Sequence, residues 1–200
     1  MSRDLSHESF PDVHHDSHSK TVFGFWLFPL TEFILFGTLF ATYAVLRDNT
    51  FGGPSAKELF KLPFALEQAL ILLACSFTAG LGGVASHRGE KKKTIFFFLL
   101  TFILGAVFLG MDLNEFSHLV ATGNGWQRNG FLSAFFTVVG THALHIALAL
   151  LWTLIHLWPV FRHGITAITL KRLTCLRMFW QFLNVIWVYI FTFIYLMGSI

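Results

Sequence analysis

Long apolar runs separated by short polar connectors make up almost the whole chain after residue 21. Each run has about 18 residues or more, which is enough for a helix to cross a hydrocarbon core roughly 30 Å thick. Backbone groups inside lipid must be paired within the segment, so each run is expected to be a helix. The pattern predicts an all-α integral membrane bundle of five transmembrane helices, at about residues 22–46, 63–86, 94–120, 132–159 and 175–199.

The first 21 residues differ from the rest, so we divide the chain into a tail, 1–21, and a membrane domain, 22–200. The tail is polar, and we expect it to be flexible and to lie in the cytoplasm. It does not have the basic start and short apolar core of a secretory signal. Its histidines could in principle bind a metal, but clustered histidines in a polar tail are usually solvated, and nothing is built on them; they are His7, His14, His15 and His18.

Composition and charge support a membrane protein and set its orientation. Apolar residues make up 54% of the chain and charged residues 12%, whereas about a quarter of the residues in soluble domains are charged. Lys and Arg gather on the cytoplasmic side of membrane proteins. The side holding the tail and the second and fourth connectors has ten, against four on the other side, which predicts a cytoplasmic amino terminus and a periplasmic carboxyl terminus. We attribute the basic pI of about 9.0 to this asymmetry and expect no nucleic-acid partner.

Polar side chains inside the spans are the candidate functional residues, because an ionisable group in a bilayer is costly. At about 1.5 Å of rise per residue, Glu32 and Asn184 lie at similar depths, near the cytoplasmic half of the first and last helices. His145 reaches the same level. We therefore predict an inner polar cluster, structural or proton-supporting, made of Glu32, His142, His145, Gln181 and Asn184.

A second set of polar residues lies near the outer ends of the helices. Asp112, Glu115 and His118 follow each other at a helical spacing of three, and Glu67 stands at the start of the second helix. We predict that these four residues form an outer polar cluster, with Arg47 or Arg128 close enough to stabilise its acids. Hydrogen bonding between helices is the simpler role for both clusters.

We find no sign of a redox or metal centre in this chain. His142 and His156 are spaced for two stacked haems, but no facing helix carries a matching histidine pair. The candidate acids and histidines divide between two depths, so we predict no metal, no cofactor and no catalytic residue here. Cys75 and Cys175 are interpreted as small apolar residues. Small residues mark expected close helix contacts, among them Gly80, Gly83, Gly105, Gly110 and Gly140.

Four polar-marked segments, taken in order, resemble the haem-copper oxidase subunit III family. RNGFLSAFFTVVGTHALH, residues 128–145, is similar to the family's G-x-H-x-L-H helix, and FGFWLFPLTEFILF, residues 23–36, to the helix with its intramembrane carboxylate, here Glu32. MDLNEF, residues 111–116, and MFWQFLNVIW, residues 178–187, resemble its acidic segment and last helix. Gln181 and Asn184 replace the family's His and Asp, which makes proton transfer along that helix doubtful.

The five-helix length of the chain and its segments TYAVL, GGP and FLSAFF are most similar to the cytochrome o, or bo-type, ubiquinol oxidase branch of this family. The resemblance implies a non-catalytic subunit of a proton-pumping quinol oxidase in the bacterial inner membrane. Haem and copper are then expected in subunit I, which would be the main partner beside the other subunits and bound phospholipid. This chain would support the stability and proton uptake of subunit I.

Two alternatives remain open at this stage. The chain could be a subunit III-like partner of a cytochrome c oxidase or a nitric oxide reductase. It could also be a stand-alone transporter or proton channel, although broken helices or inverted repeats, which mark many transporters, are not found in the sequence.

Overall fold

The computed structural model describes residues 17–53, 56–59 and 62–199. The long helices are α1 (Ser17–Leu46), α3 (Leu62–His87), α4 (Lys91–Ala121), α5 (Gly130–His163) and α6 (Ala167–Ile190). A short helix, α2 (Ala56–Leu59), precedes α3, and α6 continues into a π-helical segment, η1 (Phe191–Leu196), and a last turn, α7 (Met197–Ser199). The described residues contain no strand, which confirms the all-α class.

Five helices are long and apolar enough to cross a membrane. The candidate spans are Gly24–Leu46, Leu62–His87, Lys91–Ala121, Gly130–His163 and Ala167–Leu196, with mean hydropathies from 1.5 to 2.4. Their number agrees with the five transmembrane helices predicted, and the chain is a multi-pass membrane protein. Most of the expected tail, residues 1–16, lies outside the described residues, while α1 already begins at Ser17.

The last span begins at Ala167 rather than near residue 175 as expected. Thr166 caps this helix: its side chain accepts from the backbone N–H of Thr169, and the Thr169 hydroxyl accepts from the backbone N–H of Thr166. This reciprocal arrangement satisfies two backbone donors at the start of the helix. The basic residues Lys171 and Arg172 therefore lie in its first turns and not in a loop.

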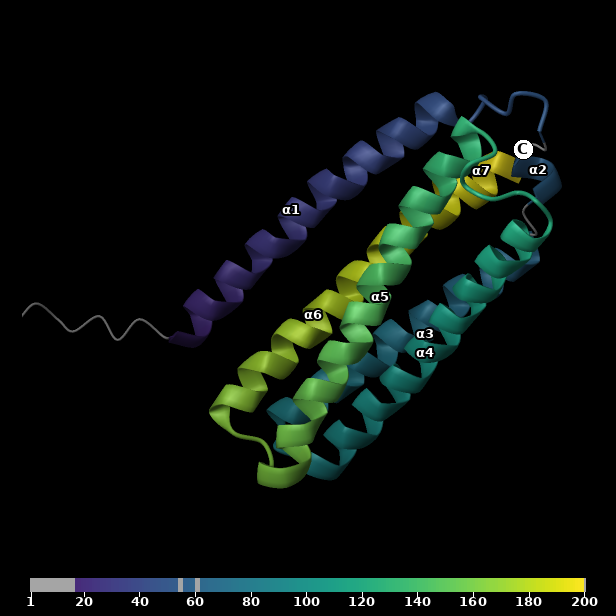
Figure 1. Ribbon diagram of the computed structural model, residues 1–200. Coiled ribbons are helices and arrows are strands. Elements are labelled where there is room, and N and C mark those ends of the chain that lie inside the picture. Colours follow the sequence, from purple (N-terminus) through teal and green to yellow (C-terminus); the bar gives the residue numbers. More distant parts are fainter. Residues whose placement is uncertain (1–16, 54–55, 60–61, 200) are drawn as a thin grey trace, which may run out of the picture.

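Four of the long helices form a closely packed bundle, and α1 lies along one side of it (Figure 1). Helix α3 packs against α4 and α6, α5 packs against α4 and α6, and α1 contacts α5 and α6. Successive spans run in opposite directions, so the α3–α4 and α5–α6 connections lie at the same end of the bundle (Figure 1). Large fully buried side chains fill the centre, including Phe108, Ile146, Trp180, Leu183 and Trp187.

Two glycines allow large side chains to approach a helix backbone. A Cβ atom on Gly105 of α4 would lie 2.5 Å from the Trp180 ring of α6, and one on Gly83 of α3 would overlap Cδ of Arg177. By contrast, a Cβ on Gly80 or Gly110 would meet no atom within 4 Å. Only some of the small residues predicted to mark close contacts therefore do so within the described chain.

Candidate functional sites: two polar pairs in the bundle

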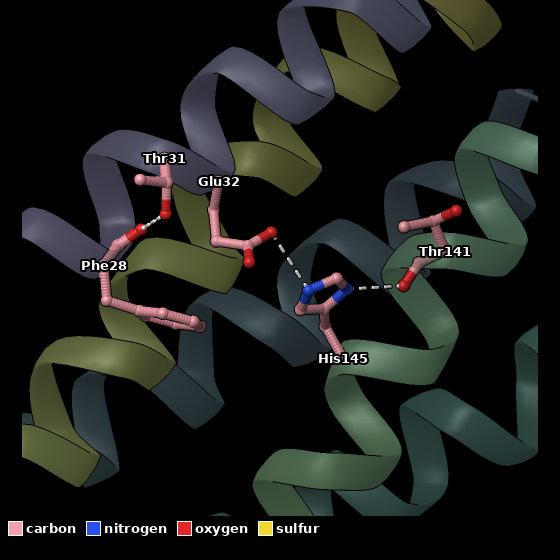
Figure 2. Close-up of polar contacts among 5 residues, drawn as sticks. All are labelled: Phe28, Thr31, Glu32, Thr141 and His145. Carbon is pink, nitrogen blue, oxygen red and sulfur yellow. Dashed lines mark hydrogen bonds and ion pairs between the residues drawn. The ribbon is translucent and has the colours of Figure 1, made fainter.

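Glu32 of α1 and His145 of α5 point toward each other across the interface between these helices (Figure 2). Glu32 Oε2 lies 3.2 Å from His145 Nε2, and the two side chains are 15% and 12% exposed. Other faces of the imidazole are covered by Phe36, at 5.6 Å between ring centroids, and Phe179, at 6.5 Å. This contact joins α1, the helix beside the bundle, to its centre.

The second ring nitrogen of His145, Nδ1, determines which nitrogen carries a hydrogen. Nδ1 lies 2.7 Å from the carbonyl oxygen of Thr141, which can only accept, so Nδ1 carries a hydrogen and donates it (Figure 2). Nε2 then faces Glu32, and a proton bound to either Nε2 or the carboxyl would lie between the two side chains. Oε2 has no aligned donor, so the contact is an ion-pair contact and not a linear hydrogen bond.

His142 is fully buried and belongs to a different environment from Glu32. Its Nε2 lies 3.1 Å from the carbonyl oxygen of Leu183 in α6. Its ring packs against Trp187, at 5.3 Å, and Phe108, at 5.8 Å. His142 therefore connects α5 to α6, whereas His145, one turn along, connects α5 to α1.

The structure does not bring Gln181 and Asn184 to the Glu32–His145 pair. Gln181 is exposed and lines a small cavity of about 180 Å³ with Trp26, Pro29 and Phe33 of α1. Asn184 is half-buried, and among the described residues neither side chain hydrogen bonds to Glu32 or His145. Depth along the helix suggested a meeting, but rotation about the α6 axis turns Gln181 outward.

Toward the end of the bundle that holds the α4–α5 connection, Asp112 of α4 pairs with Gln68 of α3. Both are completely buried, and Gln68 Nε2 donates to Asp112 Oδ1 at 2.8 Å. The neighbouring acid, Glu115, accepts a hydrogen bond from the Tyr195 hydroxyl at 3.0 Å. Tyr195 lies in η1, where the wider π-helical turn occurs at the end of the last span. Sequence reasoning missed both Gln68 and Tyr195, although an amide inside an apolar run was a signal for the first.

Among the described residues, the other two members of the predicted outer cluster form no ion pair with these acids. Glu67 and His118 are exposed, and His118 lines a cavity of about 190 Å³ with Asn114 and Glu115. The expected arginine support is also different. Arg47 lies 3.6 Å from Asp48, and Arg128 donates to Asn124, so each has a local partner. The cluster is thus a buried Gln68–Asp112 pair and a part-buried Glu115–Tyr195 pair beside two exposed side chains.

Hydroxyl and indole groups join the helices elsewhere in the core. The Trp180 indole N–H of α6 donates to Thr153 of α5 at 3.1 Å, and Thr78 of α3 lies 2.8 Å from Thr101 of α4, hydroxyl to hydroxyl. These contacts are the interhelical hydrogen bonds expected of a membrane bundle.

Chemically, the two sites can hold protons. Within the described part of the chain, no three His, Cys, Asp or Glu side chains converge to hold a metal ion. The side chains of the tail histidines, His7, His14, His15 and His18, lie outside that part. Cys75 and Cys175 are buried and free.

Known proteins resemble this chain over nearly all of its length. The family model described as "Cytochrome c oxidase subunit III" matches residues 1–199. "Cytochrome bo(3) ubiquinol oxidase subunit 3" of Pseudomonas aeruginosa is 48% identical over 189 residues, covering 94% of this chain and 90% of that protein. The protein of the same name from Pseudomonas putida is 46% identical, covering 92% and 89%. "Cytochrome c oxidase subunit 3" of Bacillus sp. (strain PS3) is 40% identical, covering 88% and 86%.

Proposed function

Because this chain belongs to the cytochrome c oxidase subunit III family, we propose that it is the non-catalytic third subunit of a proton-pumping terminal oxidase that oxidises ubiquinol. The observation that carries the proposal is its 48% identity, over 189 residues, to a protein named as subunit 3 of a ubiquinol oxidase. Haem and copper would reside in subunit I.

Subunit I is the partner we propose for the apolar faces of the bundle. Only 11% of the α1 span is buried within the chain, and its exposed side chains include Trp26, Leu30 and Ile34. A helix surface this apolar is stable only against lipid or against another membrane protein. The other subunits of the oxidase and lipid would cover what subunit I does not.

Bound phospholipid is the second proposed partner. An apolar groove of about 540 Å³ lies between α1 and α5, lined by side chains such as Phe25 and Phe28 on α1 and Leu148 and Ile155 on α5. An acyl chain is unbranched, flexible and apolar, and a groove of this volume and lining can hold part of one.

We propose that the chain lies in the bacterial inner membrane with its amino terminus in the cytoplasm. The support is the distribution of charge between the two ends of the bundle. The end with the α3–α4 and α5–α6 connections carries most of the Lys and Arg: Arg88, Lys91, Lys92, Lys93, Arg162, Lys171, Arg172 and Arg177. With five spans, the carboxyl terminus would then lie in the periplasm.

Glu32 and His145 would hold α1 against α5 in this complex and would provide a site that can bind a proton. The pair joins α1 to α5, and it keeps an acid in the membrane at a small cost because its partner can carry the opposite charge. Such a pair can support proton uptake by subunit I without taking part in oxygen reduction.

Copurification tests the assignment. An affinity tag on this chain should recover, from native membranes, a haem-containing subunit and ubiquinol oxidase activity. The chain itself, after separation from the complex, should carry no haem. Recovery of the chain without a haem protein would refute the proposal and would favour a stand-alone transporter or proton channel.

A second assignment has one observation in its favour. The Bacillus relative named as a cytochrome c oxidase subunit is 40% identical, so the family includes partners of cytochrome c oxidases. Activity of the purified complex with reduced cytochrome c and not with ubiquinol would select that alternative. A complex that reduces nitric oxide in place of oxygen would select a nitric oxide reductase.

A further inference from the structure

The buried pair of Gln68 and Asp112 contains two oxygens with no hydrogen-bond donor. Gln68 Nε2 donates to Asp112 Oδ1 at 2.8 Å, and both residues are 0% exposed. Gln68 Oε1 and Asp112 Oδ2 are also buried, and neither has a partner among the described residues. One hydrogen bond is thus flanked by two unsatisfied acceptors, which is an unfavourable arrangement in a bundle core.

No neighbouring group in the described chain can neutralise a charged Asp112. The charged group that acts on it is Glu115 on the same helix, which has the same sign. Tyr195, from η1, donates its hydroxyl hydrogen to Glu115. No lysine, arginine or histidine in the described part of the chain forms an ion pair with Asp112. Because Asp112 has no exposed surface, a partner subunit or a lipid headgroup cannot reach it.

We propose that Asp112 and Gln68 form a proton-binding site, in which Asp112 is a neutral carboxylic acid. The proton sits on Oδ2 and is donated to Gln68 Oε1, while Gln68 Nε2 donates to Oδ1. A carboxylic acid and a primary amide each present one donor and one acceptor on adjacent atoms, so together they close a planar ring of two hydrogen bonds. One proton thereby satisfies both orphaned oxygens and removes the uncompensated charge.

Glu115, one turn along α4, is also within reach of the Gln68 amide, but it is less deeply buried than Asp112. It accepts a hydrogen bond from Tyr195 and lines the cavity that includes Asn114 and His118. The proton on Asp112 is separated from that cavity because Asp112 itself is fully buried. The site therefore holds a permanently bound proton that stabilises the contact between α3 and α4. It does not exchange protons during turnover. This inference does not rest on the proposed function of the chain.

Infrared spectroscopy of the native complex, purified by a tag on this chain, tests the site. A protonated carboxyl has a C=O stretching band that a carboxylate lacks. We expect such a band in the wild type, its loss in Asp112→Asn, and its retention in Asp48→Asn, whose side chain is 88% exposed. Asp112→Asn should also assemble to at least half of the wild-type level, because an amide pair preserves both hydrogen bonds.

A second variant tests the pairing itself. Gln68→Met removes both partners of the acid, so the C=O band should persist and move to higher frequency. The proposal is overturned if the wild type and Asp112→Asn have the same carboxyl bands, as expected when a water molecule bridges a charged Asp112 and Gln68. Failure of Asp112→Asn to assemble, or an unmoved band in Gln68→Met, would overturn it as well.

Discussion

Glu32 of α1 and His145 of α5 meet at 3.2 Å, Oε2 to Nε2, while the other imidazole nitrogen donates to the Thr141 carbonyl (Figure 2). The two residues are far apart in the sequence, and α1 has few other polar contacts with the bundle among the described residues. The pair attaches α1 to the bundle and, under the proposed function, also holds a proton, and substitutions can separate these two roles.

Replacement of Glu32 by Gln should preserve the attachment and remove the proton site. The amide N–H can donate to Nε2 of a neutral His145, so the complex should assemble at close to the wild-type level. Without a titratable group, we expect proton uptake to be slower and the oxidase to inactivate sooner during turnover. Oxygen consumption followed over many turnovers measures this. Glu67→Gln, at an exposed acid, is the matched control, and equal time courses for the two variants would leave Glu32 with a bracing role alone.

Replacement of Gly105 by Ala should destabilise the bundle. The new methyl group would lie 2.5 Å from the fully buried Trp180 ring, and the ring is held by its hydrogen bond to Thr153. Overpacking of this kind costs about 1–3 kcal/mol. Thermal unfolding of the purified complex should occur at a lower temperature, while Gly110→Ala, which meets open space, should leave it unchanged or raise it slightly. Equal melting temperatures would contradict the packing described for α4 and α6.

Replacement of Thr153 by Val should leave the Trp180 indole without its acceptor. A buried donor that loses its partner costs about 1–3 kcal/mol, and Val keeps the shape of Thr. Thr137→Val is the control, because Thr137 is exposed on the same helix and, among the described residues, its hydroxyl bonds only to the Ser133 carbonyl of the same helix. Denaturation in detergent should separate the two variants. A loss of stability in Thr137→Val as large as that in Thr153→Val would argue against the interhelical bond.

Glu90 and Lys93 at the start of α4 should give a small, pH-dependent contribution to stability. The side-chain hydrogen bond from Lys93, at 2.7 Å, lowers the pKa of Glu90 below its ordinary value of 4.5. A carboxyl whose pKa is lowered in the folded state stabilises that state above its unfolded pKa. The contribution is lost as the pH falls through the folded pKa. The difference in melting temperature between wild type and Glu90→Gln should therefore be present at neutral pH and vanish in acid. High salt should reduce it at neutral pH; a difference that persists in acid would contradict this assignment.

The membrane spans could be predicted from the sequence because hydropathy reports a local property, the preference of a segment for lipid. Five runs of sufficient length predict five helices whatever their neighbours are. Depth follows in the same way, since each residue adds about 1.5 Å along the axis. Glu32 and His145 were thus expected at one level, and Asp112 and Glu115 at another.

The lateral partners of these residues could not be predicted, because rotation about a helix axis depends on how all the helices pack. Gln181 has a suitable depth but faces outward, whereas Gln68, an amide in an apolar run, is turned onto Asp112. Tyr195 contacts Glu115 from the π-helical segment η1, and no pattern in the sequence predicted a π-helix there.

The sequence by itself determined that this is a five-span helical membrane protein and which polar side chains lie at each depth. Only the tertiary structure decided that Glu32 pairs with His145 and Asp112 with Gln68, and that Gly105 but not Gly110 is in close contact. The physical reason is that transfer into lipid is settled residue by residue along one chain. Pairing depends on the positions of two helices at once.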